Sequence, residues 1–147
     1  MAKVLIIYHC NTGNTEEMAN AVLEGAKSVS GTEVALKRAF DATYDDLIGC
    51  DVVAFGSPMN FSYMAGALKD FFDRAWRSWQ QKSAEKPYSI FGSAGSGRRE
   101  ALDSIDNLCN RYYKLRSLTE GIVAQGKPSP EVLNQCRELG KKLATAI

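Results

Sequence analysis

The 147-residue chain lacks several features that would place it in other functional classes. No apolar run approaches the roughly 18–20 residues that a membrane-spanning helix needs, and the stretch Val4 to Tyr8 is too short for a signal sequence. The four cysteines show neither a C-x-x-C pair nor zinc-ligand spacing, a pattern typical of reduced thiols. We therefore expect a soluble cytoplasmic protein that binds no membrane and no metal.

The chain also has little net charge. The formal value is +1, which removes the strongest argument for nucleic-acid binding, since affinity for phosphate backbones rests on concentrated lysine and arginine. The two halves differ, however: residues 1–73 hold 5 basic and 10 acidic side chains, and residues 74–147 hold 13 basic and 7 acidic ones. The basic half indicates either solvated helix faces or a docking surface for an acidic partner.

The length is that of one domain, since domains usually run to about 100–200 residues, so we expect residues 1–147 to form a single domain. Short apolar runs alternate with amphipathic segments, which is typical of an α/β fold with a parallel sheet. The expected strands are 4–8, 32–40, 51–55, 88–91 and 118–124, and the expected helices are 16–29, 64–79, 101–112 and one that begins at Ser129 and Pro130. Right-handed crossovers between five parallel strands predict a three-layer, doubly wound sandwich.

In such a sheet, ligands bind beyond the carboxyl ends of the strands where the strand order reverses. The loop after the first strand, residues 9–15, is rich in small, hydroxyl and amide side chains and leads directly into a helix. The helix start and the hydroxyls of Thr12 and Thr15 make this loop a candidate phosphate cradle. Neither the lysine of a G-x-x-x-x-G-K-[ST] loop nor a G-x-G-x-x-G run is present there.

Cys10 raises a rival interpretation. Low-molecular-weight tyrosine phosphatases also place a cysteine in this loop, with an arginine six residues later that clamps the phosphate oxygens. That position is Glu16 here, and a carboxylate would repel a phosphate dianion. We therefore interpret Cys10 as a loop thiol and His9 as a residue of the rim, and we expect no catalytic residue.

The loops after the third and fourth predicted strands could hold a ring system. Residues 56–64 offer backbone N–H groups for the carbonyls of a heterocycle, and Met59, Phe61 and Tyr63 are candidate apolar walls. Residues 92–99 are rich in glycine, which lets the backbone approach a ring edge closely.

The segment Tyr8 to Val22, with Thr12-Gly13-Asn14-Thr15-Glu16 and Met18-Ala19, resembles the FMN-phosphate signature of flavodoxins. The resemblance covers essentially the whole chain and is strongest to short-chain members, because the fifth strand lacks room for the roughly twenty-residue insertion of long-chain ones. It implies a flavodoxin-like sheet of order 2-1-3-4-5, noncovalent FMN and an electron carrier that works with a redox partner protein. The family has Ser or Thr at Cys10, and a thiol is a weaker donor, so we expect reduced FMN affinity.

The FMN-binding residues that these three loops and the resemblance imply are His9, Cys10, Asn11, Thr12, Gly13, Asn14, Thr15, Ser57, Pro58, Met59, Asn60, Phe61, Ser93, Ala94, Gly95 and Gly97.

The second loop supports an alternative. The run Gly56-Ser57-Pro58, then Gly66, Leu68-Lys69, Phe71 and Asp73-Arg74, is similar to NAD(P)H-dependent FMN and quinone reductases. Residues 92–99 hold no stacking aromatic, which would leave one flavin face open to NAD(P)H and substrate. A small NAD(P)H-dependent reductase is therefore the alternative to the carrier. In either case we expect a monomer or a homodimer. Arg98 and Arg99 predict a less negative second reduction potential than in acidic flavodoxins.

Overall fold

The computed structural model describes residues 2–79 and 85–146. Its centre is a parallel sheet in which β1 (Ala2–Tyr8) lies between β2 (Thr32–Arg38) and β3 (Val52–Asn60), and β5 (Pro87–Ala94) follows β3. Residues 4–8 are all buried, as expected for an apolar, β-branched run in a strand covered on both faces. The predicted α/β fold and the order of its first four strands are confirmed.

The fifth sheet position is divided. Two short strands, β6 (Arg116–Ser117) and β7 (Ile122–Gln125), both pair in parallel with β5, where one strand over 118–124 was predicted. Gly121 lies in the interruption with φ 92°, and a Cβ there would lie 2.7 Å from the Ile90 side chain. The left-handed backbone and the close approach to β5 explain why regular pairing stops.

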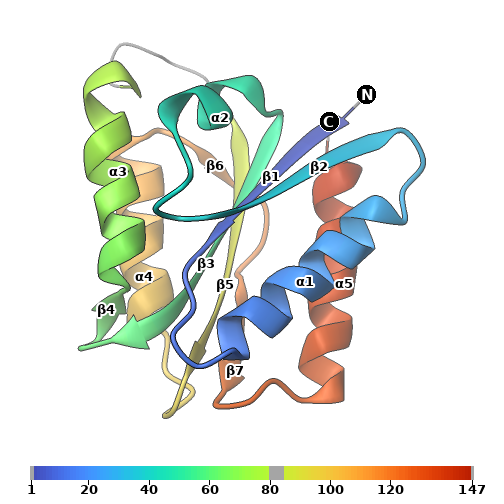
Figure 1. The fold of residues 1–147 in the computed structure, drawn as a ribbon, viewed down its shortest axis with the longest axis vertical. Helices are drawn as coiled ribbons and strands as arrows, with labels where there is room; N and C mark the ends of the chain where they lie inside the picture. Colours follow the sequence, from blue (N-terminus) through green and yellow to red (C-terminus); the bar gives the residue numbers. More distant parts are fainter. Residues whose placement is uncertain (1, 80–84, 147) are drawn as a thin grey trace.

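The helices cover the two faces of the sheet (Figure 1). On one face, α1 (Asn14–Lys27) and α5 (Pro130–Ala144) pack on Val4, Ile6 and their neighbours. The other face of the sheet, with Leu5, Ile7 and their neighbours, is covered by four helices. These are α2 (Tyr44–Gly49), α3 (Gly66–Trp79), α4 (Glu100–Asp106) and the π-helix η1 (Asn107–Tyr112). Alternate residues of one strand therefore serve two separate cores, which gives the predicted three layers.

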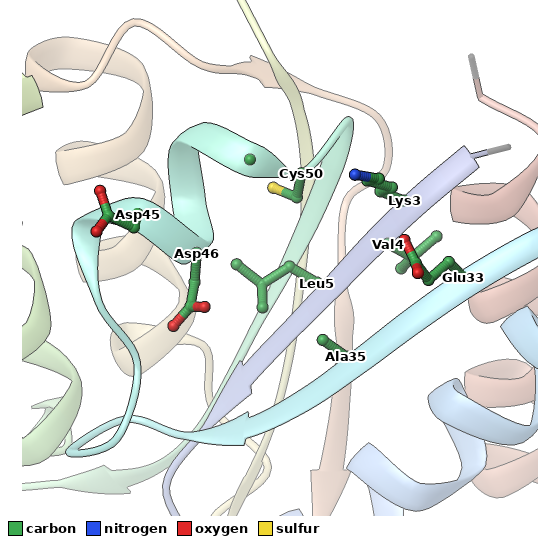
Figure 2. Close-up of a pocket in the computed structure, with 9 residues that line it drawn as sticks. Lys3, Val4, Leu5, Glu33, Ala35, Asp45, Asp46 and Cys50 are labelled. Atoms are coloured by element: carbon green, nitrogen blue, oxygen red, sulfur yellow. The ribbon is translucent and has the colours of Figure 1, made fainter.

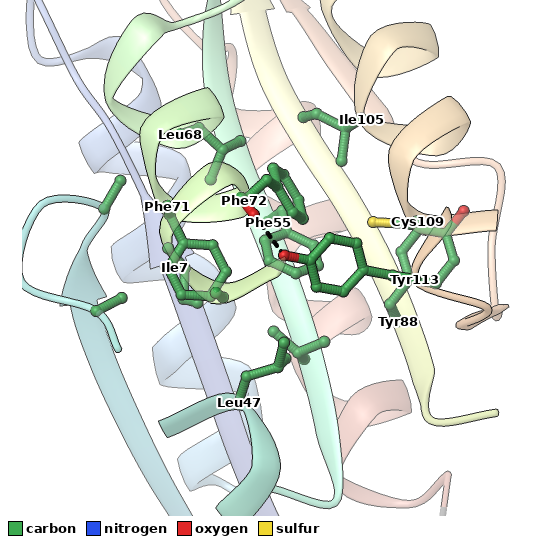
Figure 3. Close-up of a cluster of buried hydrophobic side chains, with 14 of the residues drawn as sticks. Ile7, Leu47, Phe55, Leu68, Phe71, Phe72, Tyr88, Ile105, Cys109 and Tyr113 are labelled. Carbon is green, nitrogen blue, oxygen red and sulfur yellow. Dashed lines mark hydrogen bonds between the residues drawn. The ribbon is translucent and has the colours of Figure 1, made fainter. Parts of the chain in front are cut away.

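Aromatic residues dominate the core under α3 (Figure 3). The rings of Phe55 and Phe72 lie 5.0 Å apart, and the Tyr113 hydroxyl donates to the Phe72 carbonyl oxygen at 2.6 Å. The Trp79 indole N–H donates to the Tyr113 carbonyl oxygen at 2.8 Å. Each buried polar atom of this cluster thus has a partner, and Trp79 belongs to the core.

Several predicted boundaries were wrong. The short helix α2 was not predicted, α1 starts two residues earlier than expected, and the last turns of the predicted helix over 101–112 form η1. Residues 56–60 and 92–94, predicted as loop, continue β3 and β5. Glycine, serine and proline locally favour a turn, but here the pairing of Ser57 with Gly92 and of Pro58 with Ser93 prevails.

Beyond Asn60 the chain turns back in a hairpin, because β4 (Tyr63–Met64) pairs antiparallel with the end of β3. The start of α5 matches the prediction, since the Ser129 side chain accepts the Val132 N–H and Pro130 is the first helical residue. No helix within residues 2–79 and 85–146 is long and apolar enough to cross a membrane.

Candidate functional site

The three predicted loops meet at one end of the sheet, at the carboxyl ends of β1, β3 and β5 (Figure 1). A pocket of about 270 Å³ lies between them. Its lining consists of Asn11, Thr12 and Asn14 from the first loop, Pro58, Met59 and Asn60 from the second, Ser93, Ala94 and Gly95 from the third, and Gly126. Nine of the sixteen residues expected from the sequence therefore line one cavity.

The first loop keeps several hydrogen-bond donors free. Gly13 has φ 100°, and this left-handed residue leads directly into α1. Within the part of the chain that the structure describes, the backbone N–H groups of Thr12, Asn14 and Thr15 have no acceptor, nor do the side chains of Thr12 and Asn14 have a partner. Free donors at the start of a fourteen-residue helix suit a phosphate dianion, so the loop fits the phosphate of FMN.

The Glu16 carboxylate, which follows the first loop, is held by two side chains. It accepts a hydrogen bond from the Tyr8 hydroxyl at 3.0 Å and from the Arg38 guanidinium at 3.3 Å. Partial burial, followed by the hydrogen bond to Glu16, raises the pKa of Tyr8, so the phenol stays protonated and donates. Arg38 thereby offsets the negative charge of Glu16, and the Tyr8 hydroxyl donates a hydrogen bond to it.

The Thr15 side chain is not part of the pocket lining. It is buried at 1% exposure, and its hydroxyl lies 2.9 Å from the Ser93 hydroxyl at the end of β5. Ser93 lines the pocket, whereas Thr15 lies behind it. The first and third loops are thus joined by a buried hydrogen bond.

A second set of hydrogen bonds joins the first loop to the β3–β4 hairpin. The His9 ring Nε2 donates to the Asn11 side-chain oxygen at 2.9 Å, because an amide oxygen can only accept. The Asn11 amide then donates to the Asn60 side-chain oxygen at 3.2 Å. The His9 ring also contacts Phe40 edge to face at 6.3 Å. His9 therefore supports the wall of the pocket from the rim.

The tip of this hairpin is formed by Phe61 and Ser62, whose φ values of 54° and 60° are both left-handed. Non-glycine residues rarely adopt this conformation, which is nevertheless the one that suits a two-residue hairpin turn. The Phe61 side chain is fully exposed and is not part of the pocket lining. The structure thus brings Met59 and Asn60 into the pocket and leaves Phe61 at its outer edge.

Four other expected residues lie outside the lining. The fully buried Ser57 hydroxyl donates to the Pro58 carbonyl oxygen at 2.7 Å and accepts the Ala65 N–H at 2.8 Å, so it supports the chain entering α3. Gly97 lies against the Gln125 side chain. Cys10 and Gly13 form the closed turn beneath the first loop.

Gly126 was missed by sequence reasoning. Its N–H donates to the Ala94 carbonyl oxygen at 2.9 Å, which holds the segment after β7 against the third loop. The available signal was the rule that the carboxyl ends of parallel strands share one edge of the sheet, applied to the fifth strand as well.

The two arginines of the third loop are paired. Arg98 lies 3.1 Å from Glu100, and Arg99 donates to the Glu120 carbonyl oxygen at 2.9 Å and lies 3.4 Å from Asp103. Exposed ion pairs of this kind are worth little individually and are screened by salt. The positive charge expected beside the flavin is therefore partly offset.

Another hollow lies at the opposite end of the sheet, between β1, β2 and α2 (Figure 2). One of its carboxylates has structural partners: Asp46 accepts from Lys37 at 2.9 Å and from both the N–H and the hydroxyl of Thr43. Among the described residues, no group of three or more histidine, cysteine or acidic side chains could hold a metal ion.

The reductase-like residues after β3 have roles in the fold. The Arg74 guanidinium donates to the carbonyl oxygens of Ala39 and Ala42, both at 2.9 Å, and pairs with Asp70 at 2.7 Å. Phe71 is fully buried in the aromatic core. These residues bind α3 to the segment after β2, and none of them lines the pocket.

Comparison with known proteins decides the family. A flavodoxin of Aquifex aeolicus (strain VF5) is 38% identical over 160 aligned residues, which cover 98% of this chain and 86% of that protein. The chain belongs to the flavodoxin family. No protein-family model matches the sequence.

Solved structures agree with this flavodoxin fold. A flavodoxin from the domain Archaea superposes with a TM-score of 0.84 at 24% identity, covering 98% of this chain and 97% of that one. The flavodiiron protein from Giardia intestinalis gives 0.83 at 25% identity, covering 97% of this chain and 35% of that chain. The flavodoxin resemblance and the flavodoxin-like fold predicted from the sequence are confirmed.

Proposed function

We propose that this flavodoxin holds FMN noncovalently in the pocket at the carboxyl ends of β1, β3 and β5, and passes electrons between protein partners. Flavodoxins are FMN-binding electron carriers, and this chain is one of them. The observation that carries the placement is the group of backbone N–H donors of Thr12, Asn14 and Thr15 at the start of α1, which have no acceptor among the described residues. Bound FMN would supply the redox chemistry through its isoalloxazine ring.

The protein's own part is to bind and orient. Thr12, Asn14 and the backbone N–H groups would hold the phosphate, and the dipole of α1 would favour its negative charge. Asn60 and Met59 would form one side of the ring site, and Ala94 and Gly95 the other, where the absence of a side chain at Gly95 permits close approach. The nine predicted residues that line the pocket would thus divide into a phosphate part and a ring part.

A carrier is favoured over an NAD(P)H-dependent reductase. The reductase-like residues on α3 contribute to its packing, as Arg74 illustrates with its bonds to Ala39 and Ala42. The pocket end also exposes Phe40, Phe61 and Tyr63, which suits contact with a partner protein. We propose that residues 1–147 act as one FMN-binding domain in the cytoplasm, a compartment that keeps thiols such as the four unpaired cysteines reduced.

A titration of apoprotein with FMN tests this proposal. We expect one FMN per chain, quenched flavin fluorescence, and release of the flavin on denaturation. Thr12→Ala should weaken FMN binding by about tenfold or more, since a hydrogen bond to a charged group is worth roughly 1.5–3 kcal/mol. Thr145→Ala, near the C-terminal end of α5, is the matched control and should bind like the wild type. A wild-type protein that binds no FMN, or equal effects of the two variants, would refute the proposal.

A further inference from the structure

A hollow of about 220 Å³ lies between α3 and η1, and it shares no lining residue with the pocket at the carboxyl ends of β1, β3 and β5. We call it the aromatic hollow. Its lining is apolar apart from one carboxylate and consists of Phe72, Asp73, Trp76, Leu108, Tyr112 and Tyr113. The Asp73 carboxylate is paired with Lys69 at 2.7 Å, so its charge is offset. The aromatic hollow therefore offers mainly apolar surface.

Two of its rings are accessible and stand at right angles to each other. The ring planes of Trp76 and Tyr112 make an angle of 89°, and their centroids lie 6.2 Å apart. Tyr112 is 45% exposed and Trp76 is half-buried, whereas Phe72 and Tyr113 belong to the buried core (Figure 3). The Arg111 guanidinium lies 5.6 Å from the centre of the Tyr112 ring. Tryptophan, tyrosine and arginine dominate the binding energy of protein interfaces, and here one of each lies in contact at the surface.

Positive side chains border the aromatic hollow. Arg111, Lys114 and Arg116 are all exposed and occur between positions 111 and 116. Arg111 contacts Tyr112, and Lys114 directly follows Tyr113. Among the residues that the structure describes, none of the three cations forms an ion pair. Unpaired cations beside an apolar hollow are complementary to a negatively charged partner.

We propose that the aromatic hollow is a docking surface for an acidic protein segment. One apolar side chain of the segment enters the hollow, and its flanking carboxylates pair with Arg111, Lys114 and Arg116. A cationic side chain is a poor occupant because the Arg111 guanidinium already lies over the Tyr112 ring. Single-stranded nucleic acid is disfavoured as well, since its bases stack on open ring faces, and here Trp76 stands perpendicular to Tyr112. The proposal does not depend on FMN binding.

A segment docked there leaves the flavin pocket open. The helix α3 begins at Gly66, next to the β3–β4 hairpin at the pocket end, and extends toward the opposite end of the sheet (Figure 1). Trp76 lies in the last turn of α3, roughly 15 Å along the helix axis from Gly66. The docking surface is therefore an anchoring contact, separate from the end of the molecule where the flavin would exchange electrons.

A synthetic peptide tests the proposal. The probe is Glu-Glu-Glu-Phe-Glu-Glu-Glu with a tetramethylrhodamine label, titrated with the full chain and followed by fluorescence anisotropy. We expect saturable binding with a Kd below about 1 mM, weakened by about threefold or more at about 0.5 M NaCl. Serine in place of the phenylalanine, or lysine in place of the glutamates, should weaken binding by about fivefold or more.

Variants of the chain test where the peptide binds. Tyr112→Ala should weaken peptide binding by about fivefold or more, and so should Lys114→Glu combined with Arg116→Glu. The matched control is Lys27→Glu combined with Lys142→Glu, the same change of charge at exposed positions of α1 and α5 on the other side of the sheet. This control should bind the peptide within about twofold of the wild type. Thermal unfolding of each variant reports whether the fold is retained.

Other outcomes would overturn the proposal. These include a wild-type protein without saturable peptide binding up to about 1 mM, and equal losses in the two charge-reversal variants. An equal loss in Phe40→Ala, which removes an exposed ring at the pocket end, would place the peptide there instead. Tighter binding of oligothymidylate than of the peptide would assign the surface to nucleic acid. A dimer in sedimentation that Tyr112→Ala dissociates would assign it to a second copy of this chain.

Discussion

The Cys10 sulfur accepts the backbone N–H of Gly13 at 3.0 Å, across the turn that precedes α1. It also accepts the Glu16 N–H at 3.3 Å. In flavodoxins this position is Ser or Thr, so in this chain a thiol takes up two backbone donors at the base of the phosphate loop. The loop keeps its turn, but it loses a strong hydroxyl donor toward the anion.

Cys10→Ser should therefore raise FMN affinity by about three- to tenfold, because a hydroxyl can accept the Gly13 N–H and also donate strongly to phosphate. The measurement is the FMN dissociation constant from flavin fluorescence. Cys10→Ala is the control, since it removes donor and acceptor together and should show no gain. Weaker binding by Cys10→Ser than by the wild type would contradict this account of the loop.

Lys86 is a buried cation that completes the end of α2. Its ammonium donates to the carbonyl oxygens of Leu47 at 2.7 Å and of Ile48 at 3.3 Å, and also to that of Cys50. Carbonyls at a helix end have no partner within the helix. Lys86→Met leaves them without a donor and should lower the free energy of unfolding by about 2–4 kcal/mol in urea.

Lys69→Met is the matched control for Lys86→Met. Lys69 is partly exposed and, among the described residues, pairs only with Asp73 on its own helix, so its replacement should cost less than about 0.5 kcal/mol. Lys86 contacts the end of α2 and does not line the pocket, so FMN affinity should stay unchanged in both variants. Equal losses of stability in the two variants would show that the hydrogen bonds from Lys86 to the three carbonyl oxygens do not stabilise the protein more than an exposed ion pair does.

The contact between α1 and α5 depends on glycine. A Cβ on Gly140 would lie 2.1 Å from the Val22 carbonyl oxygen, which is backbone and cannot move aside cheaply. Gly140→Ala should therefore destabilise the protein by about 2–4 kcal/mol in thermal or urea unfolding. Gly66→Ala, at the start of α3, should be neutral, because no described atom beyond its chain neighbours and the backbone of its own helix lies within 4 Å of the added Cβ. A stable Gly140→Ala variant would mean that the two helices pack less closely than described.

The capping box of α2 predicts a pH dependence of stability. Partial burial pushes the pKa of Asp46 up, but hydrogen bonds from Lys37 and Thr43 outweigh it, and the pKa is lowered overall. A lowered folded pKa contributes stability above the unfolded value of about 3.9, and this contribution is lost as the pH falls through the folded value. Asp46→Asn should thus cost about 1 kcal/mol at pH 7 and progressively less below pH ~4. A cost independent of pH between 7 and 3 would contradict this assignment.

Local sequence patterns predicted much of the fold, and the misses have specific causes. The β-branched run at Val4 to Tyr8 and the Ser129-Pro130 start gave correct elements, because their signals lie within a few residues. The Thr43-x-x-Asp46 capping box was visible in the sequence and was overlooked. Phe61 and Ser62 are residue types that rarely form a two-residue hairpin turn, so no local sequence pattern predicted the turn at these positions.

The candidate site also has features that the sequence predicts and features that it does not. Clustering of the three loops followed from the topology of a parallel sheet, and nine expected residues line the pocket. The pairing of Thr15 with Ser93 depends on which face of β5 meets α1 at its last residues, and this register is not contained in either segment alone. The inward direction of Ser57 has the same origin, since its partner Ala65 lies on the far side of the hairpin.

An anaerobic visible spectrum of the FMN-loaded protein, recorded before and after addition of NADH or NADPH, tests the carrier function most directly. We expect the flavin to bind, to stay oxidised with either nucleotide, and to bleach when dithionite or a reductase protein is supplied. Rapid bleaching of the bound flavin by NADH or NADPH alone would contradict it and identify the protein as a reductase.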